Sequence, residues 1–249
     1  MVTTLGVVEI RNTDDTPLLT AFRRLGGKSL LEWVVRRMTD SQQLGQVIVL
    51  CPDIPQAQEL SNILPRDIPL MISDGADAPA RLTAALDQYP AEGVVCVAAE
   101  HPFVDPELID RLITTASNHP ESDYIGFCSR HGRSAVMAPL GMIGEWVRAT
   151  TLKRANLEAH DPQERSGATT ILLAHPERFN LRLIPVPQEL DRNDLRLVIN
   201  GEEDWENVQA IYEALGPEHL DYQRIAGLLD HQPAIRQRMA ALNRLIGAA

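Results

Sequence analysis

Two short stretches that share one pattern decide the fold of this chain. They are Ala99-Glu100-His101-Pro102-Phe103-Val104-Asp105-Pro106-Glu107-Leu108-Ile109-Asp110 and Asp194-Leu195-Arg196-Leu197-Val198-Ile199-Asn200-Gly201-Glu202-Glu203-Asp204-Trp205. Each reads as the end of an apolar strand, then a polar residue and a turn, then an amphipathic helix. Ligands of open α/β sheets bind outside the carboxyl ends of the strands, where such turns lie. We therefore expect Glu100 and Asn200, the polar residues at the two ends, to face one ligand site.

Strands and helices alternate along roughly the first hundred residues. Strand–helix–strand units of this length imply parallel pairing through right-handed crossovers. The expected strands are Leu5–Ile10, Gln46–Leu50, Pro69–Ile72 and Gly93–Ala98, and the expected helices cover the stripe from Leu30 to Met38, Pro55–Leu64 and Ala78–Tyr89.

The regular alternation of strands and helices ends after a fourth expected helix over Pro106–Ser117. The remaining expected elements are a hairpin of Tyr124–Cys128 and Ser134–Ala138, helices covering Ile143–His160, strands at Leu181–Pro185 and Leu195–Ile199, and helices over Glu202–Leu215, Tyr222–Leu229 and Pro233–Ile246. No linker or repeat divides the chain. The pattern predicts one α/β domain over residues 1–249, a Rossmann-like mixed, mostly parallel sheet flanked by helices, with a helical tail over residues 217–249.

Composition limits the class of protein. The 249 residues are 44% hydrophobic and 23% charged, as in ordinary globular proteins, and the net charge of −11 argues against binding to nucleic acid or an anionic membrane. The three cysteines show no zinc-site spacing. No stretch approaches the ~20 apolar residues of a membrane helix, and the N-terminal residues lack a signal-peptide pattern. We expect a cytoplasmic location.

Several common site motifs are absent or weak. Gly26-Gly27-Lys28-Ser29 resembles the end of a P-loop, but Phe22 occupies the place of the first glycine, so a turn and a helix capped by Ser29 is the favoured interpretation. The chain has no dinucleotide fingerprint and no nucleophile elbow. His101 follows Glu100 directly, and because adjacent strand residues point to opposite faces, we do not expect the two to act as a pair.

The quoted stretches and four other segments resemble the cytidylyltransferases of the spore-coat-polysaccharide type, relatives of CMP-acylneuraminate and CMP-octulosonate synthetases. His101–Asp110 resembles the family's "c-P-L-I-D-P-E-L-I-D" element, and Leu195–Leu215 its "R-L-T-V-D-t-x-E-D-L-E-L-V-x-x-I-Y-E-x-L" element. The other matches are Val7–Glu32 to the opening strand, phosphate loop and helix, residues 75–82 to "G-s-e-D-V-L-x-R-y", Gly141 and Glu145 to "G-l-x-x-E", and Glu164-Arg165 to the start of "E-R-E-H-V-T".

The resemblance implies a GT-A-like nucleotidyltransferase fold and transfer of CMP from CTP to a sugar or sugar acid, with release of pyrophosphate. It implies Mg²⁺ as cofactor, CTP or CMP and a sugar or sugar acid as partners, and a homodimer formed through the segment from Tyr124 to Arg165. The residue roles that it implies are phosphate binding for Arg11, Mg²⁺ binding for Glu100 with help from Asn200, nucleotide binding for Gly75, Asp77 and Arg81, and acceptor positioning for Glu145 and Arg165.

The chain departs from the family at the polar positions. Only Arg11 remains of the phosphate loop "A-R-x-g-S-x-R-L-P-G-K", and Leu19 and Thr20 replace its glycine and lysine. Asp14 and Asp15 stand where the triphosphate should lie, and their negative charges would repel it. The repulsion would be smaller if the two carboxylates themselves helped to hold Mg²⁺. The two family aspartates become Glu100 and Asn200, and the histidine of "E-R-E-H-V-T" is missing.

Two hypotheses stay open at this point. The first is an active or partly active cytidylyltransferase. The second is a catalytically inactive nucleotide- or sugar-binding or regulatory homologue on the same fold. A GT-A glycosyltransferase is disfavoured because no D-x-D motif ends a strand, Asp74 and Asp77 having the wrong spacing. The sequence leaves open whether CTP is turned over.

Overall fold

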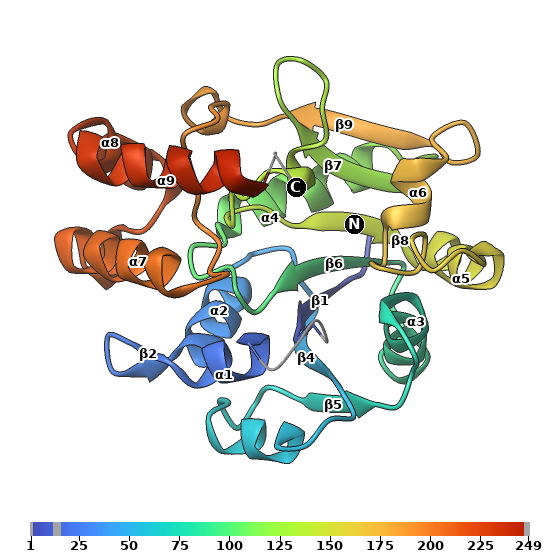
Figure 1. Cartoon of the computed structure of the whole chain (residues 1–249). Helices are drawn as coiled ribbons and strands as arrows, with labels where there is room; N and C mark the ends of the chain where they lie inside the picture. The colour runs from blue at the N-terminus through green and yellow to red at the C-terminus, as the bar shows by residue number, and fades with distance from the viewer. Residues whose placement is uncertain (1, 12–15, 247–249) are drawn as a thin grey trace.

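A seven-stranded sheet organises the molecule. The structure, a computed structural model, describes residues 2–11 and 16–246 (Figure 1). Within these ranges the sheet has the strand order β5 (Leu70–Ser73), β4 (Gln46–Pro52), β1 (Thr4–Glu9), β6 (Gly93–Ala98), β8 (Glu145–Arg148), β7 (Tyr124–Cys128), β9 (Leu181–Pro185). All adjacent strands pair in parallel except β8, which is antiparallel to both neighbours. The predicted mixed, mostly parallel sheet is confirmed.

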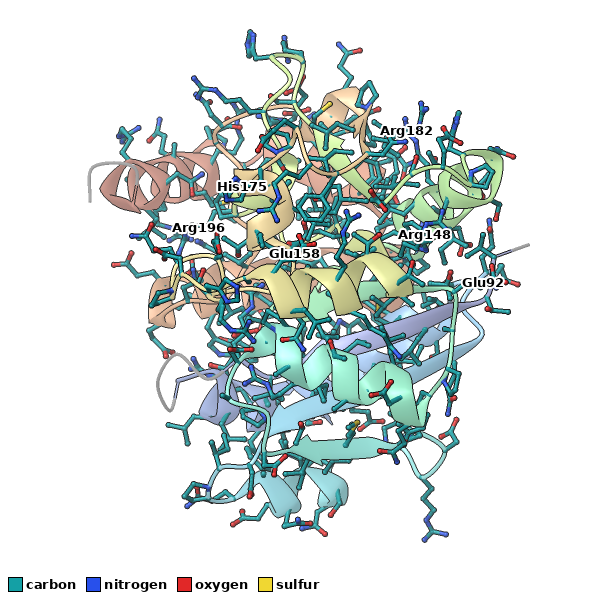
Figure 2. All side chains as sticks on the ribbon, turned by 90° about the vertical axis from the view of Figure 1, so that its right-hand side faces the viewer. Glu92, Arg148, Glu158, His175, Arg182 and Arg196 are labelled. Carbon is teal, nitrogen blue, oxygen red and sulfur yellow. The ribbon has the colours of Figure 1, made fainter. Side chains whose placement is uncertain are left out.

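Helices cover both faces of the sheet. One face carries α3 (Ala78–Gln88), α5 (Ala149–Glu158) and α6 (Thr170–Ala174), and Figure 2 looks onto this side, where α5 lies alongside α3. Their buried side chains, such as Leu82 and Leu152, form one apolar cluster with the strands. The opposite face carries the larger cluster, with α1 (Thr16–Phe22), α2 (Leu30–Thr39), α4 (Pro106–Asn118), α7 (Glu202–Leu215), α8 (Tyr222–Asp230) and α9 (Pro233–Ile246).

The remaining elements are short. A small hairpin pairs β2 (Arg24–Leu25) with β3 (Lys28–Ser29), and 3₁₀ turns cover Ala57–Asn62, Ala135–Met137, Gln188–Leu190 and Pro217–His219. In this hairpin the P-loop-like residues make the turn, and the Ser29 hydroxyl accepts a hydrogen bond of 3.0 Å from the Glu32 amide at the start of α2. The predicted helix cap is confirmed, because Ser at this position satisfies an amide that has no partner inside the helix.

The middle of the chain corrects two predictions. The expected helix over Ile143–His160 is shorter, because Glu145–Arg148 forms β8 between β6 and β7. Trp146 of β8 is fully buried, and a Cβ on Gly93 of β6 would lie only 2.4 Å from its indole ring. Burial of this large side chain against a neighbouring strand outweighs the helical preference of the segment.

The same strand displaces the second half of the expected hairpin. The chain turns at residues 130–133 as predicted, with the Ser129 amide bonded to the Arg133 carbonyl at 2.9 Å. Only Ser134 then pairs with Cys128, and Ala135–Met137 forms a 3₁₀ turn instead of a strand. The expected helix over Pro55–Leu64 is likewise only the 3₁₀ turn Ala57–Asn62.

The predicted strand Leu195–Ile199 does not join the sheet. Its backbone bonds go to two different loops, since the Leu197 amide donates to the Pro139 carbonyl at 2.9 Å and the Ile199 amide to the Glu100 carbonyl at 3.0 Å. The segment therefore connects the turn after β6 to the segment before β8. No helix in the described ranges has both the length and the apolar character needed to cross a membrane.

Gly141 lets the segment before β8 come close to the backbone of Leu197, so replacing this glycine should destabilise the fold. It has a φ of +60°, and a Cβ there would lie 2.2 Å from the Leu197 carbonyl oxygen. Gly132 has a similar φ of +73° but open space around its Cβ position. We expect Gly132→Ala to cost about 1–2 kcal/mol of unfolding free energy from backbone strain alone. Gly141→Ala should cost about 1–3 kcal/mol more from overpacking.

Urea denaturation of the two variants beside the wild type measures both costs. Equal destabilisation by the two substitutions would contradict the close contact between Gly141 and Leu197.

Candidate functional site

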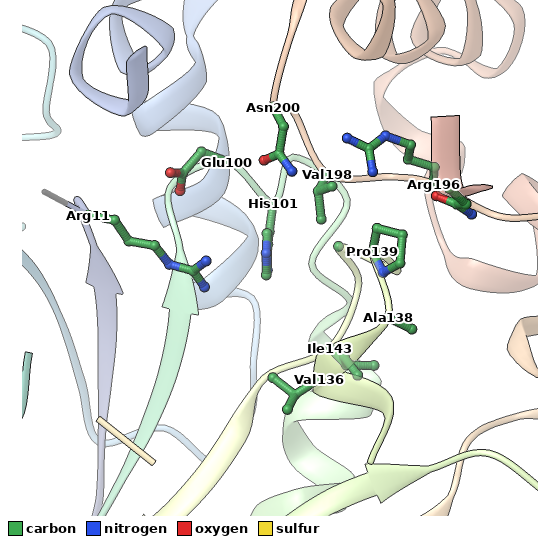
Figure 3. Close-up of a pocket in the computed structure, with 12 residues that line it drawn as sticks. Arg11, Glu100, His101, Val136, Ala138, Pro139, Ile143, Arg196, Val198 and Asn200 are labelled. Atoms are coloured by element: carbon green, nitrogen blue, oxygen red, sulfur yellow. The ribbon is translucent and has the colours of Figure 1, made fainter. Parts of the chain in front are cut away.

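A pocket of about 350 Å³ opens at the carboxyl edge of β1 and β6 (Figure 3). Arg11, Glu100 and His101 line one side, and Asn200 lies above them. The opposite wall is mostly apolar. The residues of this wall are Val136, Ala138, Pro139, Gly141, Ile143, Arg196, Val198 and Asn243. The two strand-end residues singled out in the sequence, Glu100 and Asn200, thus face one pocket.

Glu100 and His101 reach this pocket from a turn rather than from a strand. β6 ends at Ala98, and the His101 amide donates to the Ala98 carbonyl at 3.1 Å. Because the chain turns here, Glu100 and His101 both line the pocket, so the expectation that they point to opposite faces is wrong.

His101 is a neutral imidazole in this site. Its burial, with a smaller contribution from the nearby Arg11 guanidinium, lowers the pKa of the ring from 6.5 to about 3. Its Nδ1 is buried and has no hydrogen-bond partner within the described part of the chain. His101 therefore stays uncharged at neutral pH and can serve as a hydrogen-bonding group, not as a cation.

Asn200 is held by an ion pair between Arg196, which lines the pocket, and Asp204. Arg196 and Asp204 are 4% and 3% exposed, and two hydrogen bonds of 2.6 and 2.9 Å join the guanidinium to the carboxylate. The same carboxylate accepts the Asn200 amide at 2.9 Å. This pair fixes the backbone of residues 196–204 and so sets where the Asn200 side chain lies.

Gly75 and Arg81, predicted to bind nucleotide, lie behind the pocket rather than in its wall. Arg81 is buried, and its guanidinium contacts Glu9 at the end of β1 and the Gly75 carbonyl, at 3.4 and 3.3 Å. Burial raises the pKa of the Glu9 carboxyl, although Arg81 and Arg11 oppose this shift. These residues form a buried polar layer beneath Arg11.

Asp77 and Arg165 bind one another. Asp77 caps α3 by accepting the Ala80 amide at 3.1 Å, and Arg165 Nη2 donates to its carboxylate at 2.9 Å. Arg165 also donates to the Asn156 and Ala159 carbonyls, both at 2.8 Å. Burial would raise the pKa of Asp77, but the bonds from Arg165 and Ala80 lower it overall. The pair joins the start of α3 to the end of α5.

Glu145, at the start of β8, completes the buried polar layer. Its carboxylate accepts the Tyr124 hydroxyl and, at 3.1 Å, the Thr169 hydroxyl. Burial raises the pKa of Glu145, while these hydrogen bonds and the Arg11 charge oppose the rise. Of the five residues assigned to nucleotide or acceptor binding, none belongs to the described lining of the pocket.

The oxygen donors at the pocket fit a magnesium ion that is shared with a substrate. No group of three or more His, Cys, Asp or Glu side chains gathers anywhere in residues 2–11 and 16–246. Glu100 supplies one carboxylate and Asn200 one amide oxygen. Mg²⁺ is commonly held by one or two carboxylates together with substrate phosphates. Asp14 and Asp15, the other candidate ligands, lie outside the described residues.

Three polar residues of the described pocket lining, Arg196, His101 and Asn243, were not assigned a role from the sequence. Arg196 was visible as the first residue of the matched "R-L-T-V-D" element, whereas His101 was set aside because a strand was assumed. Asn243 lies on α9 in the C-terminal tail, and its Nδ2 donates to the Asn193 and Leu195 carbonyls at 3.1 and 2.8 Å. No sequence signal points to Asn243, because its place depends on how the tail helix packs.

Comparison with known families gives the class of protein. Residues 20–179 match the model of the MobA-like NTP transferase domain, which is well over half of the chain. The chain belongs to this family. It is also 28% identical over 137 residues to the spore coat polysaccharide biosynthesis protein SpsF of Bacillus subtilis, an alignment that covers 55% of this chain and 53% of that protein. The chain thus spans about half the length of this relative.

Solved structures share the fold. A cytidylyltransferase from Leptospira borgpetersenii is 19% identical with a TM-score of 0.80, covering 95% of this chain and 96% of that one. A CMP:2-keto-3-deoxy-manno-octonic acid synthetase complexed with CTP is 12% identical with a TM-score of 0.62, covering 85% and 98%. Rv0371c of Mycobacterium tuberculosis, in complex with manganese, is 15% identical with a TM-score of 0.58, covering 84% and 99%.

The contacts of Arg165 indicate a structural contribution that should depend on pH. Arg165→Met should lower the unfolding free energy by about 2 kcal/mol at neutral pH, since hydrogen bonds to charged groups contribute about 1.5–3 kcal/mol each and the site is partly solvated. Because the folded-state pKa of Asp77 lies below 3.8, this contribution is present above pH 3.8 and is lost as the pH falls further.

Urea denaturation at several pH values measures this difference between wild type and variant. Lys153→Met is the control, because Lys153 forms an exposed ion pair with Asp87 and should contribute little. A stability loss for Arg165→Met no larger than that of the control would contradict the prediction.

Proposed function

We propose that this chain transfers CMP from CTP to a sugar or sugar acid and releases pyrophosphate. The observation that carries the proposal is the meeting of Arg11, Glu100 and Asn200 at one pocket on the carboxyl edge of the sheet. Membership of a nucleotidyltransferase family and the shared fold with cytidylyltransferases support it. SpsF and the sugar-acid synthetase suggest a role in making surface-polysaccharide precursors.

Arg11, together with the side-chain oxygens of Glu100 and Asn200, would bind the triphosphate and its metal ion. Arg11 follows β1, is exposed and points into the pocket, where its guanidinium would bind a phosphate oxygen. Glu100 and Asn200 would hold Mg²⁺, which supplies positive charge to the phosphate oxygens. The acceptor hydroxyl would be held in the same pocket, in line with the α-phosphate, because proximity and orientation make a large contribution to such transfers.

The buried polar layer would act by shaping this edge of the sheet. Arg81 holds both Glu9 and the carbonyl of Gly75, so it fixes the loop before α3 where the nucleotide base would lie. Asp77 and Arg165 fix the start of α3. Glu145 would position the acceptor side through β8, which adjoins β6.

CTP binding and its dependence on Mg²⁺ test the proposal. A ligand at 100 times its Kd raises the unfolding free energy by about 2.7 kcal/mol, so millimolar CTP with Mg²⁺ should raise the Tm. Glu100→Gln should abolish the Mg²⁺-dependent part of this rise. Glu92→Gln is the matched control, because Glu92 precedes β6 at the opposite end of the strand and should leave the rise intact.

Pyrophosphate release separates the two candidate functions. With CTP, Mg²⁺ and a sugar acceptor present, the proposal expects release above the rate without acceptor. A CTP-induced rise in Tm without pyrophosphate release under any acceptor would favour the non-catalytic, nucleotide-binding homologue. The absence of any shift with CTP, with or without metal, would sink both nucleotide-based functions.

A homodimer through residues 124–165 is part of the proposal. Leu157 on α5 is 76% exposed and lies within this segment. Leu157→Lys should shift the protein towards the monomer in size-exclusion chromatography with light scattering. Leu19→Lys is the control, since Leu19 is 66% exposed but lies outside the segment. An unchanged mass for Leu157→Lys, or a monomeric wild type, would contradict this assignment.

A further inference from the structure

The two sides of the pocket differ in charge. Of the described residues that line it, the two cations are Arg11 and Arg196. Residues 12–15, outside the described ranges, are Asn-Thr-Asp-Asp and add no cation. Arg196 is bound in bidentate fashion to the buried Asp204, so its charge is already compensated. Among the described lining residues, the positive charge that is not held in a buried ion pair therefore lies on the side of Arg11, where the triphosphate would lie.

The wall opposite Arg11 is apolar. Val136, Ala138, Pro139 and Ile143 come from the segment before β8, and Val198 comes from the segment held by Arg196. A carboxylate or phosphate group placed against this wall would lose its hydration without meeting a cation, which is costly. The apolar wall instead fits the C–H face of a sugar ring, a deoxy carbon or a methyl group.

The same side of the pocket carries one hydrogen-bond donor and one acceptor that have no partner among the described residues. Arg196 Nη1 and Asn243 Oδ1 are buried and have no hydrogen-bond partner among the described residues. The Asn243 amide nitrogen donates to two carbonyls, which fixes the amide with its oxygen as the spare group. A hydroxyl both accepts and donates, so one hydroxyl can satisfy both atoms. A carboxylate can only accept and would leave Asn243 Oδ1 unsatisfied.

From these observations we infer that the acceptor is a neutral, hydroxyl-bearing sugar with an apolar face, and not a sugar acid. Arg196 donates a hydrogen bond to a hydroxyl of this acceptor, and Asn243 accepts one from it. Val136, Pro139 and Val198 pack against the carbon face of the sugar. The inference rests on the proposed function for the identity of the pocket as the acceptor site. It narrows that function to one substrate class.

Sugars that differ only at C6 test the inference. The probes are D-galactose, 6-deoxy-D-galactose and D-galacturonate, with the corresponding gluco and manno sugars, and 3-deoxy-manno-octulosonate as a further acid. Isothermal titration calorimetry with the full chain should show, in at least one series, that the neutral sugars bind at least tenfold more tightly than the acid. Equal or tighter binding of the acid in that series, tighter binding of the octulosonate than of every neutral sugar, or binding of no neutral sugar would overturn the inference.

Two variants locate the binding in the pocket. Val198→Lys places a cation on the apolar wall and should invert the preference, so that the acid of the same series binds more tightly than the neutral sugars. Arg196→Lys can keep the charge pair with Asp204 but lacks Nη1, and it should weaken the neutral sugars about tenfold. Ala214→Lys, an exposed position on α7, is the control with the same change in charge and should alter neither. Thermal unfolding curves show whether each variant is folded. If both folded pocket variants bind the sugars as the wild type does, the assignment to this wall is overturned.

The CTP experiment distinguishes failure of the neutral-sugar inference from failure of the proposed cytidylyltransferase function. If Mg²⁺ and CTP stabilise the protein and only acids bind or are turned over, the inference is wrong and the cytidylyltransferase proposal stands. If neutral sugars bind with the stated dependence on Arg196 and Val198 but CTP has no effect, the pocket is a sugar site and the proposed function fails.

Discussion

The buried ion pair of Arg196 and Asp204 is the interaction on which the geometry of the pocket depends. The segment it anchors pairs with no strand of the sheet, yet this segment supplies Val198 and Asn200 to the pocket and bonds to Glu100 and Pro139 through its backbone. Removing one partner of a buried ion pair leaves an uncompensated charge and commonly costs about 3–5 kcal/mol. The pair therefore holds two loops and the start of α7 in one arrangement.

Charge in this protein is divided between two layers. Glu9, Arg81 and Glu145 form buried contacts beneath the carboxyl edge, where they hold strands and the start of α3 in place. Arg11 and Glu100 lie above them at the pocket. Two departures from the family pattern, Glu100 and Asn200, lie at the pocket in this upper layer. These two substitutions thus alter groups that would meet a substrate, while Arg81 still holds Glu9 and the Gly75 carbonyl beneath them.

The sequence predicted the elements whose signals are local. β7, β6, β9, α7 and α9 lie within the predicted bounds, because a short apolar run, helical periodicity, a proline start or a glycine stop marks each of them. Two of the errors depend on partners that lie far away in the sequence. Glu145–Arg148 forms a strand only because β6 and β7 leave a place for it between them. Leu195–Ile199 is as apolar as a strand but finds its hydrogen bonds in two loops.

By itself, the sequence determined most of the strands and helices, the Ser29 cap of α2 and the expectation that Glu100 and Asn200 face one pocket. The elements follow from side-chain periodicity, and the place of Glu100 follows from the rule for ligand sites at the carboxyl edge. Asn200 reaches the same pocket from a segment that joins no strand of the sheet. Tertiary structure alone decided which polar residues face the pocket and which neutralise one another. Arg165 meets Asp77 and Arg196 meets Asp204, whereas Asn243 reaches the pocket from the far end of the chain. Such pairings depend on distances between segments remote in sequence, which no local pattern encodes.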